Sequence, residues 1–122
     1  MLRIKIIILL VFAIIAATAC FSSNPKRYSI ADSKTYEASL FRQHCSICHG
    51  PEGDGKTLDD GKIVPSLREG ELKKITVDDI YRQISEGGNG MTPFRDILTE
   101  RELKLLSDFV VGDLRTGQNH LR

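Results

Sequence analysis

The sequence predicts an all-α domain with three main helices. Three segments carry apolar side chains at helical spacing, and each follows a residue of the N-cap type. No segment after residue 20 has the alternating apolar and polar pattern of a half-buried strand, and we find no internal repeat. Most glycines and prolines gather in two segments, 50–71 and 87–93, which we expect to be loops. A length of 122 residues fits one domain.

The first predicted helix runs from about Ser33 to Cys48. We expect Asp32 or Ser33 to be its N-cap, because a short polar side chain at that position can accept a bond from a free amide of the first turn. Its apolar stripe consists of Tyr36, Leu40 and Phe41.

The second predicted helix runs from about Val77 to Glu86. Thr76 is its expected cap, and Asp79 completes an approximate capping box. Gly87 and Gly88 end it. Its apolar residues at helical spacing are Val77, Ile80, Tyr81 and Ile84.

The third predicted helix runs from about Glu100 to Val111. Thr99 is its expected cap, with Glu102 completing the capping box. Gly112 lies where a left-handed C-terminal cap is expected. Its apolar face consists of Leu103, Leu106 and Val110, with Phe109 beside them.

Residues 1–19 are predicted to be a signal peptide for export. Arg3 and Lys5 form a basic start, an unbroken apolar run follows from Ile6 to Ala17, and Ala17-Thr18-Ala19 is a cleavage site of the A-x-A type. The apolar run is shorter than the ~20 residues of a spanning helix. An uncleaved anchor is the alternative.

Cys20 directly follows this cleavage site and resembles the lipid-attachment cysteine of bacterial lipoproteins, although Ala17 stands where that motif usually has Leu. A free N-terminal thiol is the alternative. We expect residues 20–32 to be a lipid-attachment cysteine and polar tether, 33–114 to be the folded domain and 115–122 a flexible tail. The protein would then lie on the periplasmic side of a bacterial membrane, anchored by lipid or, alternatively, soluble in the periplasm.

The charge balance argues against nucleic acid as a partner. Without Arg3 and Lys5, the 17 basic residues fall to 15, against 16 acidic ones. The mature chain is therefore nearly neutral, and it has no basic run interleaved with aromatic residues.

The most informative motif is C-x-x-C-H at Cys45, Cys48 and His49, which is typical of covalent haem c attachment. Two thiols at this spacing can form thioethers with the two vinyl groups of one porphyrin, and the adjacent histidine can bind the iron. A zinc site would normally need a second pair of ligands, and a thioredoxin-like site would need a βαβ context. Because the sequence offers neither, we predict one covalent haem c with His49 as proximal ligand.

Met91 is the predicted distal ligand of the iron. It is the one methionine outside the predicted signal peptide, and three of the four residues before it are glycines, which would let the backbone approach a flat ligand closely. Pro93 would stiffen the loop. The rival ligands are less well placed, since His44 is too near the attachment site to reach the opposite face and His120 lies in the tail.

These residues together resemble the class I monohaem cytochromes c, from about Ser33 to Leu114. The matching segments are Leu40-Phe41, Cys45 to Gly50, Pro65-Ser66-Leu67, Gly90 to Phe94 and Leu98 to Val110. Thr92 departs from the pattern, because proline often follows the methionine directly. The resemblance implies a cytochrome c fold wrapped around the haem, in which Phe41 packs on the last helix. It also favours a role for Pro65, whose carbonyl can accept a hydrogen bond from the outer ring nitrogen of His49.

The predicted function is therefore electron transfer rather than catalysis. With His49 and Met91 on the iron, no open position is left for a substrate, and we expect one electron to pass between respiratory redox proteins by Fe(II)/Fe(III) cycling. No small-molecule substrate is expected. Two alternatives remain open: a cytochrome c subunit of a larger oxidase or dehydrogenase complex, and a haem peroxidase or small-ligand-binding domain in which Met91 is labile.

Overall fold

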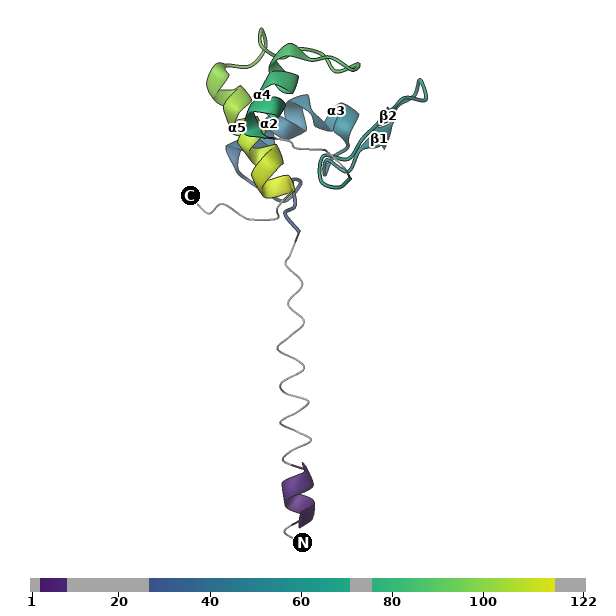
Figure 1. Cartoon of the computed structure of the whole chain (residues 1–122), viewed down its shortest axis with the longest axis vertical. Coiled ribbons are helices and arrows are strands. Elements are labelled where there is room, and N and C mark those ends of the chain that lie inside the picture. Colours follow the sequence, from purple (N-terminus) through teal and green to yellow (C-terminus); the bar gives the residue numbers. More distant parts are fainter. Residues whose placement is uncertain (1–2, 9–26, 71–75, 116–122) are drawn as a thin grey trace.

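The computed structural model describes residues 3–8, 27–70 and 76–115, and helices dominate it (Figure 1). The all-α prediction is confirmed. Residues 3–8 are helical. The domain contains α2 (Tyr36–His44), α3 (Ser46–His49), α4 (Val77–Glu86) and α5 (Glu100–Phe109), which continues into the π-helical turn η1 (Val110–Leu114). The sequence did not predict the short antiparallel hairpin of β1 (Lys56–Thr57) and β2 (Ile63–Val64).

The first predicted helix is two helices in the structure, and its cap is a different residue. Thr35 is the N-cap of α2, where its hydroxyl accepts from the amide of Ala38. Ser33 is engaged elsewhere, because its hydroxyl bonds Tyr28 at 2.6 Å. The helix breaks at Cys45, and the Ser46 hydroxyl donates to the Arg42 carbonyl at 2.7 Å, a side-chain bond that competes with the helical ladder. The break starts a separate short helix at the haem motif.

The second and third predicted helices are confirmed at their start and cap. In α4 the Thr76 and Asp79 side chains each bond the other residue's amide at 3.1 Å. In α5 Thr99 and Glu102 form the same capping box. The predicted left-handed cap at Gly112 is wrong, because Gly112 lies inside η1 and does not have positive φ. Continuing the helix through η1 buries Leu114, which a stop at Gly112 would lose from the core.

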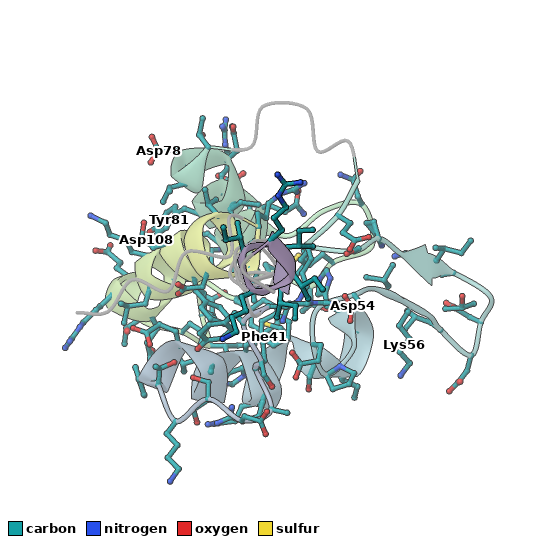
Figure 2. The ribbon with its side chains drawn as sticks, turned by 90° about the horizontal axis from the view of Figure 1, so that it is seen from below. Phe41, Asp54, Lys56, Asp78, Tyr81 and Asp108 are labelled. Atoms are coloured by element: carbon teal, nitrogen blue, oxygen red, sulfur yellow. The ribbon has the colours of Figure 1, made fainter. Side chains whose placement is uncertain are left out.

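The core lies where α5 packs against both α2 and α4. Phe41 of α2 and Phe109 of α5 are almost completely buried, with ring centroids 6.2 Å apart at 62°. Figure 2 shows Phe41 in the space between these two helices. This edge-to-face contact confirms the predicted packing of the first helix on the last.

Part of the predicted tether packs against the domain. Ile30 is fully buried, and the amides of Ile30 and Ala31 each donate to the Glu52 carboxylate at 2.9 Å. Tyr28 packs edge-on against Phe109, with centroids 5.4 Å apart. The packed chain therefore starts before the predicted boundary at residue 33. The rest of the predicted tether and residues 116–122 of the tail lie outside the described residues.

We expect Phe41→Ala and Phe109→Ala each to lower the free energy of unfolding by about 3–5 kcal/mol, because each removes a buried aromatic ring. This is a large part of the ~5–15 kcal/mol of a small domain. The double variant should lose less than the sum, since the two rings contact each other. Chemical denaturation of the haem-loaded protein measures all three, with exposed Ile97→Ala as the control. Strict additivity would contradict the contact.

Candidate cofactor site

The two cysteines of the motif lie on and just before α3, on a partly open surface. Cys48 is exposed, Cys45 is half-buried, and both are free thiols. Burial, helped by neighbouring Cys48, raises the pKa of the Cys45 thiol to about 12, so it is protonated at neutral pH. Between them Ile47 is 73% exposed, an unusual position for an apolar side chain of this size. The motif therefore presents thiols and apolar surface that a porphyrin would cover.

His49 has the chemistry of a metal ligand. Burial lowers the pKa of its ring below the usual histidine value, and the backbone of Pro65, acting as acceptor, opposes that shift. The ring is therefore neutral at pH 7, as binding to a metal requires. Its Nδ1 is buried and forms no hydrogen bond with the described residues. The backbone of Pro65 is the nearby acceptor that acts on the ring, so its carbonyl could accept a bond from one ring nitrogen while the other binds a metal.

Pro65 reaches His49 because the long loop folds back on the motif. Gly55 donates its amide to the His49 carbonyl at 2.9 Å and has φ of +84°. A Cβ on Gly55 would lie 2.5 Å from the Val64 carbonyl oxygen and 2.9 Å from the Pro65 carbonyl carbon. Only glycine allows this approach of two backbone segments. The sequence predicted a loop here, whereas the structure forms the β1–β2 hairpin, which places Pro65 directly after β2.

Met91 lies at the end of a tight turn. Gly88 and Met91 exchange backbone bonds of 3.0 and 2.9 Å, and the two residues between them, Asn89 and Gly90, have φ of 53° and 84°. An Asn-Gly pair with both φ positive is typical of a type I′ turn. A Cβ on Gly87 would lie 2.5 Å from the Met91 carbonyl oxygen. Gly87 thus allows close backbone packing within the loop, and Gly90 supplies the positive φ of the turn, whereas the sequence suggested that these glycines let the backbone approach a flat ligand.

Two of the predicted site residues, Cys45 and Met91, pack against one core. Cys45, Leu67, Met91 and Phe94 are half-buried and pack against the same buried cluster. His44 packs edge-on against Phe94, with centroids 6.2 Å apart. At the outer side, the Lys62 ammonium lies against Gly90, so the hairpin and the methionine turn meet. His120 and Cys20 lie outside the described residues.

The donor set fits a haem c. Two free thiols, a neutral imidazole with one orphaned buried nitrogen and a thioether from another loop are the groups that covalent attachment and His/Met ligation need. The sequence analysis did not single out Gln83, whose amide nitrogen lies 3.9 Å from the Met91 sulfur. Its position four residues before Gly87, at the helix end, is the sequence signal from which it could have been identified.

None of the described helices is long and apolar enough to cross a membrane.

Fold and site together define a class I c-type cytochrome, and comparisons with known proteins agree. The family model for cytochrome c oxidase, cbb3-type, subunit III matches residues 36–110, and the chain belongs to this family. The chain is 26% identical over 108 residues to cytochrome c6 of Gracilaria tenuistipitata var. liui, covering 88% of this chain and 97% of the relative.

Two solved structures share the fold. The KustC0563 c-type cytochrome is 36% identical and covers 61% of this chain and 92% of its own, with a TM-score of 0.54. A tyrosine-to-phenylalanine variant of Kustc0563 is 35% identical and covers 64% and 98%, with a TM-score of 0.56. The family implies covalently bound haem c, redox protein partners and a role in electron transfer.

We expect Cys45→Ala combined with Cys48→Ala to give little folded protein. The helices are short and the domain is small, so the apolar surface of the bound porphyrin is needed for a stable core. Circular dichroism and thermal melting of the purified double variant measure this, with Ile47→Ala, which keeps both thiols, as control. Native helix content and a cooperative melt without haem would refute the expectation.

Proposed function

We propose that this protein is a single-haem electron carrier that passes one electron at a time between respiratory redox proteins. The observation that carries the proposal is the neutral, partly buried His49 of the C-x-x-C-H motif, together with a half-buried Met91 and Cys45 that pack against one core. Membership of a c-type cytochrome family supports it.

Each residue has a separate task in this proposal. The Cys45 and Cys48 thiols add across the two porphyrin vinyl groups, each S–H giving one C–S bond and one C–H bond. His49 and Met91 would hold the iron as its two protein ligands. The Pro65 carbonyl, which lies near the His49 ring, would accept a bond from its outer nitrogen, and such a bond would fix the ligand and raise its basicity. The haem supplies the redox centre, whose iron alternates between Fe(II) and Fe(III).

The ligand pair favours a carrier over a catalyst. Two protein ligands leave no vacant position for a substrate, and a thioether opposite a histidine raises the reduction potential. A haem peroxidase or small-ligand-binding domain would need a displaceable Met91. The structure instead ties Met91 into a turn through two backbone hydrogen bonds to Gly88, which supports a stable ligand.

A second candidate function is that of a cytochrome c subunit in a larger oxidase or dehydrogenase complex. The family description, subunit III of a cbb3-type oxidase, favours it. Extraction in mild detergent distinguishes the two functions. A free carrier will purify alone, whereas a subunit will purify with its redox partners and transfer electrons within the complex.

We further propose export and lipid anchoring at Cys20, on the periplasmic side of a bacterial membrane. The packing of residues 27–32 on the domain supports a short connection, because only residues 21–26 then separate the anchor from the packed chain. At ~3.3–3.6 Å per residue these span at most about 20 Å. Such a tether would keep the domain close to the membrane that holds its partners.

Met91→Ala should open the iron to external ligands. We expect a changed absorption spectrum of the ferric haem, a lower reduction potential and carbon monoxide binding to the ferrous form. Met91→His should also lower the potential, because imidazole stabilises Fe(III) relative to a thioether. Spectroscopy and redox titration of the purified variants measure these changes. An unchanged spectrum and potential in Met91→Ala would eliminate this ligand assignment.

Cys20→Ser should leave the visible spectrum intact but block lipoprotein processing. The residue is remote in sequence from the haem motif, and stable membrane attachment needs more than one acyl chain, as a processed lipoprotein carries. Membrane fractionation and intact mass of the wild type and variant test this, with Ser22→Ala as the control. A wild type found in the soluble fraction, with the mass of haem plus the chain from Cys20, would exclude the anchor.

A further inference from the structure

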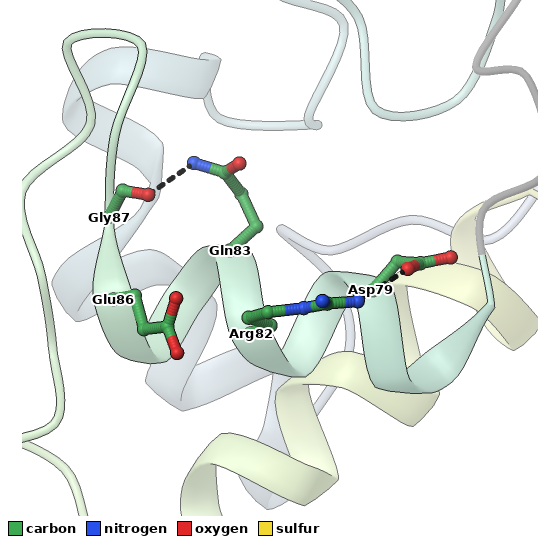
Figure 3. A pocket seen from close by; sticks show the side chains of 5 residues that line it. All are labelled: Asp79, Arg82, Gln83, Glu86 and Gly87. Carbon is green, nitrogen blue, oxygen red and sulfur yellow. Dashed lines mark hydrogen bonds and ion pairs between the residues drawn. The ribbon is translucent and has the colours of Figure 1, made fainter.

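The side chain of Gln83 points from α4 onto residues 87–93, the segment that carries Met91, which we call the methionine loop. Its amide nitrogen donates to the carbonyl of Gly87 at 3.0 Å and to that of Gly88 at 3.2 Å, and it lies 3.9 Å from the Met91 sulfur. Figure 3 shows the amide turned toward Gly87 across a polar pocket. A single side chain thus contacts both the start of the loop and the sulfur of Met91.

The last carbonyls of a helix lack hydrogen-bond partners within the helix. The Gln83 side chain supplies such a partner to the Gly87 carbonyl, at the point where the loop begins. Its own backbone carbonyl also accepts the Gly87 amide at 2.9 Å, so backbone and side chain both hold Gly87. The far end of the loop is tied to the same turn of α4, because the Phe94 amide donates to the Ile84 carbonyl at 3.0 Å. The loop therefore has two attachments, and Gln83 makes the one nearer in sequence to its start.

The position of Gly88 determines the position of Met91. The two residues are joined by a pair of backbone hydrogen bonds across a two-residue turn, and such a turn moves as one unit. A bond from Gln83 to the Gly88 carbonyl therefore acts on the methionine as well. The amide hydrogens also lie close to the sulfur, a weak acceptor.

The other polar residues of the pocket do not share this role. Arg82 is paired with Asp79 at 2.9 Å, and Glu86 is exposed at the helix end and has no N–H to donate from its side chain. Among the described residues that line this pocket, Gln83 is the one whose side chain bonds the loop carbonyls. Arg82 is therefore a suitable control, since it is adjacent to Gln83 but directed at Asp79.

We propose that Gln83 is a positioning residue for the distal ligand. It clamps the methionine loop to α4 and directs an N–H toward the Met91 sulfur, and it thereby sets how firmly Met91 holds the iron and at which potential the haem is reduced. The inference rests on the proposed function, in which Met91 is a ligand. The partial positive charge of the amide hydrogens disfavours Fe(III), so losing them lowers the potential.

The test compares Gln83→Leu, which keeps the bulk of the side chain but removes the donor, with Arg82→Gln and the wild type, all as haem-loaded full chains. Imidazole displaces a weakly held distal ligand from ferric haem. We expect Gln83→Leu to bind imidazole roughly tenfold more tightly, the effect of losing about one hydrogen bond to a ligand loop. Its reduction potential should fall, whereas Arg82→Gln should match the wild type in both measurements.

Gln83→Glu distinguishes the loss of the hydrogen-bond donor from a change in side-chain size. Its length is unchanged, but the carboxylate has no hydrogen to donate and is repelled by the loop carbonyls. We expect it to bind imidazole more tightly than the wild type, as Gln83→Leu does. This variant also keeps the test decisive if Gln83→Leu folds poorly.

The results distinguish this inference from the proposed function. Wild-type imidazole affinity and potential in both Gln83 variants, alongside an altered spectrum in Met91→Ala, would overturn the role of Gln83 and leave Met91 as the ligand. An unchanged spectrum in Met91→Ala would overturn both, because no distal methionine would then exist for Gln83 to position.

Discussion

The contact between Phe41 and Phe109 is the interaction on which the rest of the structure depends. It joins α2, which leads directly into the haem motif, to α5, against which α4 also packs. Because α4 carries the methionine loop, the position of Met91 relative to His49 is set by these helix contacts. Met91 packs against this core, and His49 follows directly from the helix that Phe41 anchors to it. A cofactor bound between them would add its own apolar surface to that core.

Around this core, loops are fixed by close backbone contacts and side-chain bonds. Gly55 lets the hairpin approach His49, and Gly87 lets the methionine loop approach the end of α4. Glu52 provides a third fixed point, because its carboxylate accepts two amides from residues 30 and 31 and pairs with the buried guanidinium of Arg68 at 2.9 Å. Removing either partner of a buried ion pair would leave an uncompensated charge, so Arg68 and Glu52 depend on each other. The segment after the haem motif is thus tied both to the N-terminal part of the domain and to the segment before α4.

Local rules predicted what short stretches of sequence control. The capping boxes at Thr76 and Thr99 were predictable because their partners lie three residues away. The chemistry of Cys45, Cys48 and His49 was predictable for the same reason, since two thiols and an imidazole within five residues need no tertiary structure to come together. The family comparison then confirmed the class of protein that this motif indicated.

The tertiary structure decided what depends on residues far apart in the chain. The continuation of α5 past Gly112, the burial of Ile30 and the hairpin that brings Pro65 near His49 all follow from packing between distant segments. The same holds for the bonds from Gln83 to the methionine loop. By itself the sequence determined the cofactor chemistry and the main helices, because both depend on neighbouring residues. The burial and orientation of the proposed ligands required the fold, because they depend on contacts that close only when the helices pack.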